Sequence, residues 1–336
     1  MKHSNVAFFV PHMGCPHACS FCDQHSISGQ LDPPVPEEIQ ETCIKALTQI
    51  SQAERAYTEI AFFGGSFTAI ERGEMLNLLN AAEVFCGEGL FAGIRISTRP
   101  DAISQEILEC LKKHKVSAIE LGVQSMDNEV LCLNRRGHTA EDAVKSAALI
   151  RKYGFSLGLQ MMTGLYGDSP ERTYRTAEQL IAMQPDTVRI YPTVVMKGTG
   201  LCELYETGKY RPPGVETSIP LVADLIQRFE EADIRVIRVG LHASPELEKK
   251  VIAGAYHPAF RELCEGEIYY RNALKQLEKT GFHRAEAWVA PTEVSKMVGQ
   301  SRRNLTRLLQ NGFQVTVKQA VGMHPFEVKI QEVKER

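Results

Sequence analysis

Residues 6–25 read VAFFVPHMGCPHACSFCDQH, and this stretch decides the fold. The apolar run at 6–10 predicts a buried strand, which leads directly into a loop carrying Cys15, Cys19 and Cys22. Their spacing is C-x₃-C-x₂-C, so three thiolates would lie on one short loop. Such a set suits an iron–sulfur cluster of the [4Fe–4S] type, in which three irons are held by cysteine and the fourth stays open to another ligand.

The alternative for these cysteines is a zinc site or a purely structural role. A zinc pattern normally brings two pairs of cysteine or histidine and therefore four ligands. No second pair of this kind follows nearby, although His12, His17 and His25 are close in sequence. The spacing therefore favours the cluster.

Length and composition describe an ordinary globular protein. The 336 residues suffice for one large domain and one small one, and 43% of them are hydrophobic. A net charge of -3 excludes a chain that is basic throughout but allows a local basic patch. No apolar run approaches the length of a membrane span. Nine cysteines, an odd number, indicate a reducing compartment, so we expect a cytoplasmic protein without membrane association.

Strand and helix patterns alternate along residues 6–240. The predicted strands are 6–10, 58–63, 93–97, 118–123, 155–161, 187–191 and 235–239. The predicted helices are 36–53, 71–86, 102–113, 126–131, 139–153, 170–183 and 218–232. Alternating units of this kind predict an α/β fold of parallel strands joined by right-handed crossovers. Active sites of such barrels gather at the carboxyl ends of the strands.

Polar and glycine-rich motifs follow several of these strands. Gly64-Gly65-Ser66 comes after the second and would let the backbone approach a ligand, although most Gly-Gly pairs are simple turns. Thr98-Arg99-Pro100-Asp101 ends the third, as a ligand contact or as a solvated loop with a helix cap. Gln124-Ser125 ends the fourth and offers amide and hydroxyl groups. Arg136 follows as a carboxylate-binding guanidinium or as a surface charge.

Together these motifs resemble the radical S-adenosylmethionine (SAM) superfamily. Within it the order Thr-Arg-Pro-Asp, Leu-Gly-Val-Gln-Ser and Arg-Gly-His-Thr is similar to the radical SAM domain of the Elongator catalytic subunit, over roughly residues 5–240. Oxygen-independent coproporphyrinogen oxidases share the Gly-Val-Gln pattern more loosely. The resemblance implies a partial (β/α)₆ barrel that binds a [4Fe–4S] cluster and SAM. It also implies an enzyme that cleaves SAM to methionine and a 5′-deoxyadenosyl radical, with a flavodoxin- or ferredoxin-type reductant.

The resemblance also implies roles for individual residues. Cys15, Cys19 and Cys22 would ligate the cluster, and Arg136 would hold the SAM carboxylate. The other SAM contacts would come from Phe21, Gly64, Gly65, Ser66, Gln124, Ser125, Met161, Met162 and Tyr191. Ordinary core packing is an equal alternative for both methionines. Lys197 would meet a nucleic-acid phosphate or lie in solvent.

Two parts of the Elongator subunit have no counterpart in these 336 residues. One is its acetyltransferase domain, and the other is the basic extension that precedes the cysteine loop. We therefore expect the radical chemistry to transfer to this chain and the carboxymethylation of a wobble uridine not to, because a fold does not determine a substrate.

Residues 241–336 predict a separate small α/β module. A helix at 262–279 precedes a strand at 284–289, helices at 292–298 and 302–310, and strands near 313–318 and 326–330. This order resembles a KH-type RNA-binding module, whose Gly-x-x-Gly turn clamps a nucleic-acid backbone. Here the turn is Gly-Gln-Ser-Arg. The RNA contacts this predicts are Lys296, Gly299, Arg302, Arg303 and Arg307. The alternative is a cap on the barrel whose arginines face solvent.

The sequence thus favours a radical SAM enzyme whose substrate is an RNA, in particular a tRNA. One alternative is a radical SAM oxidoreductase that acts on a small molecule or peptide. The other is a non-catalytic iron–sulfur protein that binds RNA or senses redox state, although a sensor would not need the SAM-binding motifs.

Overall fold

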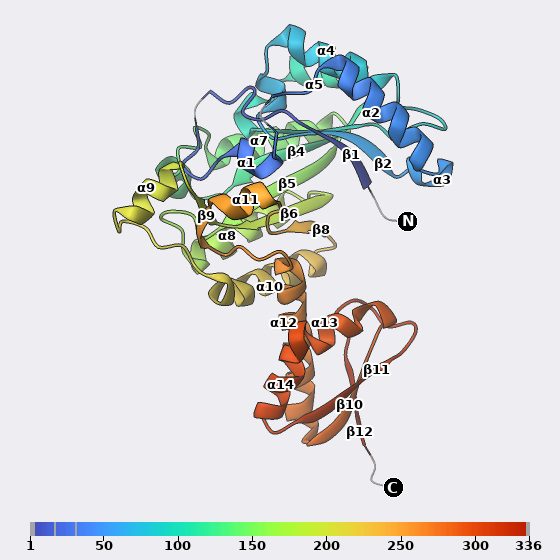
Figure 1. Ribbon diagram of the computed structural model, residues 1–336, viewed down its shortest axis with the longest axis vertical. Coiled ribbons are helices and arrows are strands. Elements are labelled where there is room, and N and C mark those ends of the chain that lie inside the picture. Colours follow the sequence, from blue (N-terminus) through green and yellow to red (C-terminus); the bar gives the residue numbers. More distant parts are fainter. Residues whose placement is uncertain (1–3, 17, 31, 334–336) are drawn as a thin grey trace.

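The computed structural model describes residues 4–16, 18–30 and 32–333, and its larger part is a curled, wholly parallel sheet (Figure 1). The strands occur in the sheet in chain order: β1 (Ser4–Phe9), β2 (Thr58–Phe63), β3 (Ile94–Thr98), β4 (Val116–Gln124), β5 (Ser156–Thr163), β6 (Thr187–Pro192) and β8 (Arg235–Val239). All seven predicted strands are present, and the predicted α/β half-barrel is confirmed. Because every neighbouring pair is parallel, the carboxyl ends of all seven strands lie at one rim.

Helices connect the strands and cover the convex side of the sheet. They are α2 (Pro36–Gln49), α4 (Arg72–Glu83), α5 (Gln105–Lys113), α6 (Asn128–Leu133), α7 (Ala140–Lys152), α8 (Pro170–Ala182) and α10 (Val215–Glu231). Local capping explains two of these starts: Ser169 Oγ accepts from Arg172 N where α8 begins, and Asp127 accepts from the first turn of α6. That cap also explains why α6 begins two residues later than the pattern predicts.

Shorter elements complete the barrel. They are α1 (Gln24–Ser28), α3 (Gln52–Arg55), α9 (Gly200–Glu206), α11 (Pro245–Lys250), and two 3₁₀ turns, η1 (Phe67–Ala69) and η2 (Pro100–Ala102). Two short strands, β7 (Val194–Met196) and β9 (Val251–Gly254), pair antiparallel. Among the described residues, no helix is both long and apolar enough to cross a bilayer.

The two faces of the large sheet differ in chemistry. Toward the helices the strands present apolar side chains such as Phe62, Ile96 and Leu159, which form the main core. On the concave side a chain of ion pairs joins β2, β3, β4 and β6: Glu59, Arg95 and Glu120 are buried, and Arg189 is half-buried. Arg95 lies 2.7 Å from Glu59 and 3.2 Å from Glu120. These charges close the floor of the barrel and leave its rim as the place where a ligand can enter.

The C-terminal residues form a small α/β module below the barrel (Figure 1). It contains α12 (Phe260–Thr280), β10 (Arg284–Val289), η3 (Pro291–Glu293), α13 (Val294–Val298), η4 (Gln300–Arg302), α14 (Arg303–Gln310), β11 (Gln314–Gln319) and β12 (Lys329–Glu332). β10 is the central strand, parallel to β11 and antiparallel to β12. Helix α12 begins in the main core with Phe260 and ends in the second core with Leu277. The helix itself therefore joins the two parts.

Candidate active site

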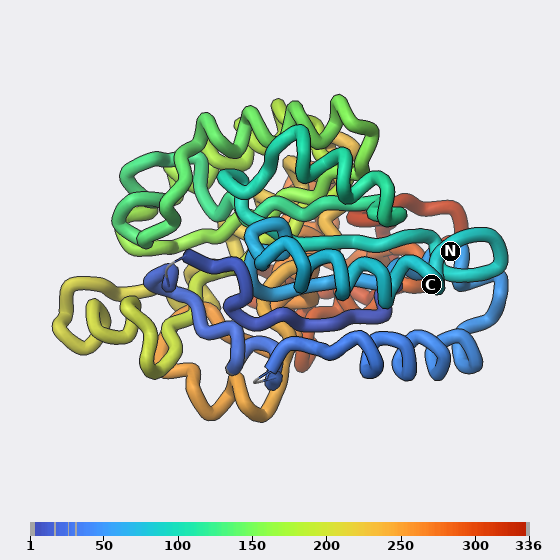
Figure 2. The backbone as a smooth tube through the Cα atoms, turned by 90° about the horizontal axis from the view of Figure 1, so that it is seen from above, coloured from blue at the N-terminus to red at the C-terminus, as the bar shows by residue number. Residues whose placement is uncertain are grey.

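The cysteine loop lies at the carboxyl end of β1, as predicted. Cys19 is buried, Cys15 and Cys22 are half-buried, and all three are free thiols. Ser20 ties the loop to the segment after α6, because its Oγ donates to Asn134 Oδ1 at 2.9 Å. The amide of Leu201 donates to the carbonyl of Ser20 at 2.7 Å, so α9 lies beside the loop (Figure 2). Hydrogen bonds from distant parts of the chain thus fix the position of the loop at the rim.

Two glycines let the cysteine loop lie directly on the loop after β2. A Cβ at Gly65 would lie 2.3 Å from the carbonyl oxygen of Met13, and one at Gly14 would lie 2.2 Å from that of Ser66. Both glycines have positive φ, +33° and +69°. The amide of Ser66 also donates to the carbonyl of Met13 at 2.7 Å. The Gly-Gly motif therefore brings these two loops into contact, whatever else it binds.

Arg136 reaches the cysteine loop from the segment after α6. One terminal nitrogen donates to Cys19 Sγ at 3.2 Å, and the other donates to the carbonyl of Gly122 at the end of β4. Its guanidinium carbon lies 6.0 Å from the centre of the Phe21 ring. The remaining nitrogen, Nε, is buried and has no hydrogen-bond partner among the described residues. Arg136 therefore brings a positive charge, and one unused donor, to the cysteines.

The electrostatics of the loop disfavour three bare thiolates. Burial, with the neighbouring Cys19, raises the pKa of Cys22 to about 12. Burial and Cys19 also raise the pKa of Cys15, while Arg99 and Arg136 act in the opposite direction. Thiolates that repel one another in this way call for a bound cation. The donor set therefore fits an iron–sulfur cluster.

A single zinc ion fits this loop less well. Zinc draws its four ligands to about 2.0–2.3 Å around one centre. Among residues 4–16, 18–30 and 32–333, no three His, Cys, Asp or Glu side chains converge in that way. A cluster separates its ligands more widely, because each thiolate holds a different iron. Three thiols that do not converge on one point are compatible with a cluster.

A cavity of about 440 Å³ adjoins the loop on the side of β3. Cys15 lines it from the loop, Thr68 from η1, and Arg99 and Asp101 from the end of β3. Arg99 is buried and binds Asp101 with two hydrogen bonds of 2.9 and 2.7 Å. Arg99 and Asp101 of this motif thus form a wall of the cavity beside Cys15.

Other predicted SAM contacts fall into two groups. Gln124, Met162 and Tyr191 lie on the concave side near the rim, and Gln160 Nε2 donates to Gln124 Oε1 at 3.1 Å. By contrast, the structure does not bring Met161 to the rim, because its side chain is fully buried in the helix-facing core. The alternation of β5 therefore assigns Met161 the packing role and leaves Met162 facing the site.

The hydroxyls of Ser66 and Ser125 are already engaged. Ser66 Oγ lies 3.0 Å from Thr98 Oγ1 and accepts from the amide of Arg99. Ser125 Oγ accepts from the amide of Asp127, ahead of α6. Both serines help to shape the loops after their strands, so a ligand would meet their backbone more readily than their side chains.

Sequence reasoning missed Asn134 and Gln160. Asn134 is fully buried and bridges the cysteine loop to the carbonyls of Val130 and Tyr166. Its signal in the sequence is a polar residue directly before two arginines. Gln160 is the one polar residue between Leu157 and Met162 of β5, which marks the concave face.

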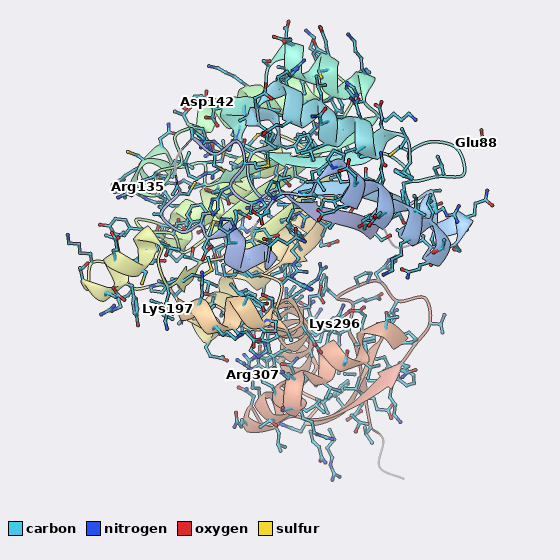
Figure 3. All side chains as sticks on the ribbon, turned by 45° about the horizontal axis from the view of Figure 1, so that its top comes forward. Glu88, Arg135, Asp142, Lys197, Lys296 and Arg307 are labelled. Atoms are coloured by element: carbon cyan, nitrogen blue, oxygen red, sulfur yellow. The ribbon has the colours of Figure 1, made fainter. Side chains whose placement is uncertain are left out.

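The predicted RNA contacts of the C-terminal turn are mostly occupied by ion pairs. Lys296 lies 2.9 Å from Glu265 and 2.8 Å from Glu293, near the junction of the two parts (Figure 3). Arg303 pairs with Glu216 of α10, and Arg307 pairs with Glu267 of α12. Arg303 therefore ties the turn to the barrel, whereas Lys296 and Arg307 tie it to α12 of the module, and their RNA role stays a prediction.

Of the remaining predicted RNA contacts, Gly299 is half-buried against Asn304, and Arg302 and Lys197 are exposed. Gly299, Ser301 and Arg302 all have positive φ, so the turn is tightly wound. Arg302 is exposed beside them. Lys197 is exposed between β7 and α9, at the edge of the barrel (Figure 3).

Comparison with known proteins shows the family of this chain. Residues 9–180 match the family model described as the radical SAM superfamily, and residues 185–270 match the radical SAM C-terminal domain. An uncharacterised protein of Methanocaldococcus jannaschii is 30% identical over 238 residues, which cover 68% of each chain. Elongator complex protein 3 of Mus musculus is 36% identical over 178 residues, which cover 51% of this chain and 31% of that protein. The predicted resemblance is confirmed.

A solved structure shares the fold. Elp3 of Methanocaldococcus infernus, with residues 1–46 deleted, superposes with a TM-score of 0.62 and 23% identity. The match covers 83% of this chain and 63% of that one. The chain spans about a quarter to a third of the length of the curated tRNA uridine(34) acetyltransferases and Elongator proteins that it matches.

Proposed function

Because the chain belongs to the radical SAM superfamily and is a radical SAM enzyme, we propose that it binds a [4Fe–4S] cluster through Cys15, Cys19 and Cys22 and acts on a tRNA. When bound, the cluster would pass one electron to SAM, which is cleaved to methionine and a 5′-deoxyadenosyl radical. The observation that carries the cluster proposal is the free, partly buried thiol set with the guanidinium of Arg136 on Cys19.

The residues around the loop would bind and orient SAM. Phe21 would pack on the adenine, and the backbone of Gly64, Gly65 and Ser66 would accept from the SAM amino group. Arg136 Nε, the unused donor, would point toward the carboxylate. Gln124, Met162 and Tyr191 would line the concave side, where the polar floor closes the barrel beneath them. In this arrangement the reacting groups would meet at the rim.

Two observations support an RNA substrate. Curated relatives of this domain are tRNA uridine(34) acetyltransferases and Elongator proteins by name. The C-terminal module also has the predicted strand–helix–turn–helix order that resembles a KH module. We propose no acetyl transfer, because the matched region covers only part of those relatives. The nine free thiols favour the cytoplasm, where a flavodoxin or ferredoxin would act as reductant.

Anaerobic turnover tests the proposal. The reconstituted protein is given SAM and dithionite, and 5′-deoxyadenosine is measured with and without total tRNA. We expect formation that rises when tRNA is added. If the amount of 5′-deoxyadenosine does not change when tRNA is added, the substrate would instead be a small molecule or a peptide. No formation, from protein that holds four irons and binds SAM, would refute the enzyme itself.

A matched pair of cysteine variants tests the ligand assignment. Cys19→Ala removes a buried loop thiol, and Cys132→Ala removes an exposed thiol on α6. We expect the first to lose the iron and its visible absorption and the second to keep both. A Cys19→Ala protein that still loads four irons and cleaves SAM would rule out Cys19 as a ligand.

A further inference from the structure

The C-terminal sheet has one face packed on helices and one open face. Figure 1 shows α12, α13 and α14 on one side of β10, β11 and β12. On that side Ala285, Ala287 and Val289 are buried in the second core. Because side chains alternate along a strand, Glu286 and Trp288 point to the opposite face. Trp288, the single tryptophan of the chain, therefore lies on the central strand of an open sheet.

Two lysines flank this tryptophan. The register pairs Trp288 with Lys318 on β11 and with Lys329 on β12. Residues in register on neighbouring strands point the same way, so both lysines share the face of the indole. Neighbouring strands are about 4.8 Å apart, which sets the two lysine backbones about 10 Å apart across the ring. A half-buried aromatic ring thus lies between two cations.

The rest of the face is polar, and each of the two lysines has one carboxylate nearby. In register with Glu286 lie Thr316 and Gln331. Lys318 lies 3.6 Å from Glu286, and Lys329 lies 3.1 Å from Glu327, with side chains 45% and 62% exposed. Partly exposed ion pairs of this kind contribute about 1 kcal/mol or less to stability. Both lysines can therefore turn to an anionic partner.

Two basic residues of the predicted turn, Lys296 and Arg307, do not have this freedom, whereas Arg302 is exposed. Lys296 contacts two carboxylates, and Arg307 pairs with Glu267, whose side chain is 8% exposed. The guanidinium of Arg307 also lies 3.6 Å from the centre of the Tyr270 ring. Releasing these residues to bind phosphate would leave buried carboxylates unpaired. Within the described part of the module, the open sheet face combines two exposed lysines with an aromatic ring, which suits it to bind a polyanion.

We propose that this face binds a single-stranded segment of RNA, with one base stacked on Trp288 and the adjoining phosphates on Lys318 and Lys329. Aromatic rings on an open sheet bind unpaired bases in this way, while lysines neutralise the backbone. The inference rests on the proposed RNA substrate, and it adds which surface of the module would bind that RNA. Stacking serves any base, so this face would position the RNA and leave the choice of nucleotide to the barrel.

The single tryptophan makes the test direct, because its fluorescence reports on this face alone. A single-stranded oligoribonucleotide and total tRNA are titrated into the full-length protein, and binding is measured in parallel by the anisotropy of labelled RNA. We expect RNA to quench the tryptophan with the same midpoint as the anisotropy. Trp288→Leu should weaken RNA binding about 5-fold or more, and Trp288→Phe should retain most of it, because stacking contributes roughly 1–3 kcal/mol.

Lysine variants test the electrostatic part. Lys318→Gln combined with Lys329→Gln should reduce the slope of log affinity against log salt by about 1.4, since each phosphate on a single strand contributes about 0.7. Lys45→Gln, on the exposed side of α2, is the matched control and should leave the slope unchanged. Equal slopes for all three proteins would contradict the placement of phosphate on these lysines.

The failure of this inference differs from the failure of the proposed function. RNA that binds without quenching Trp288, and with equal affinity for Trp288→Leu, would overturn the face and leave the RNA substrate standing. If neither RNA binds, the proposed RNA-binding face is wrong. The proposed tRNA substrate is then still tested by whether 5′-deoxyadenosine formation depends on tRNA. Tryptophan emission that shifts with protein concentration alone would assign the face to a second copy of the chain instead.

Discussion

Arg136 donates a hydrogen bond to Cys19 Sγ at 3.2 Å, although 117 positions separate them in the chain. The same guanidinium bonds the carbonyl of Gly122. One side chain therefore fixes a cysteine of the loop to the end of β4. A buried positive charge at this place stabilises extra negative charge on the loop.

Replacing Arg136 should make a bound cluster harder to reduce. Reduction adds one negative charge, and Arg136→Gln removes the cation that opposes it, so we expect a more negative midpoint potential. A redox titration followed by electron paramagnetic resonance measures this without any turnover. Arg135→Gln is the control, because Arg135 is exposed next door (Figure 3). An unchanged potential in Arg136→Gln would show that its contact to Cys19 is structural only.

Gly65→Ala should disrupt the cysteine loop. The new Cβ would meet the carbonyl of Met13 at 2.3 Å, and φ is positive, so we expect a loss of roughly 2 kcal/mol or more in unfolding free energy and a lower iron content. Gly208→Ala is the control, because Gly208 has φ +74° and nothing within 4 Å of its Cβ position. Chemical denaturation and iron analysis compare the two. Equal losses would mean that strain in φ, and not the contact between the loops, decides the effect.

Glu120→Gln should destabilise the barrel. Glu120 is 4% exposed and accepts from both Arg95 and Arg189, so its loss leaves buried cations undercompensated. We expect a loss of about 3–5 kcal/mol in the free energy of unfolding, measured with urea. Glu129→Gln breaks a pair with Arg172 in which the carboxylate side chain is 65% exposed, and should cost about 0–1 kcal/mol. Similar losses for both variants would contradict the buried role of the floor.

His138 should make stability depend on pH. Burial, with Arg136 nearby, lowers the pKa of His138 to about 4, while an unfolded histidine titrates near 6.5. As pH falls from about 6.5 to 4, the unfolded chain takes up a proton that the folded chain refuses, so stability decreases by about 3 kcal/mol at most. His138→Gln should flatten this part of the profile. Urea denaturation between pH 4 and 7 measures it, and an equal slope in the variant would remove His138 as the cause.

Much of the architecture follows from the sequence because it depends on local patterns. Apolar runs mark the seven strands, and capping residues such as Ser169 mark where helices begin. Parallel strands then place every loop that follows a strand at one rim. The strand order therefore predicts that the cysteine loop, the Gly-Gly loop and the Thr-Arg-Pro-Asp segment lie close together, and they do so in the structure.

Which side chain meets which partner was decided by the tertiary structure. The sequence shows Lys296 and Arg307 as charges beside a turn, but only the packing of α12 brings Glu265 and Glu267 within reach of them. Likewise, the sequence does not distinguish the roles of Met161 and Met162. Only the folded sheet shows that Met161 is buried in the core and Met162 lies on the other face.

The sequence by itself thus determined the class of the fold and the cysteine loop, since hydrophobic periodicity and ligand spacing act within a few residues. The tertiary structure alone decided that Arg136 contacts Cys19 and that Trp288 lies between Lys318 and Lys329. Those relationships join residues far apart in the chain. They depend on strand register and helix packing, which no local pattern encodes.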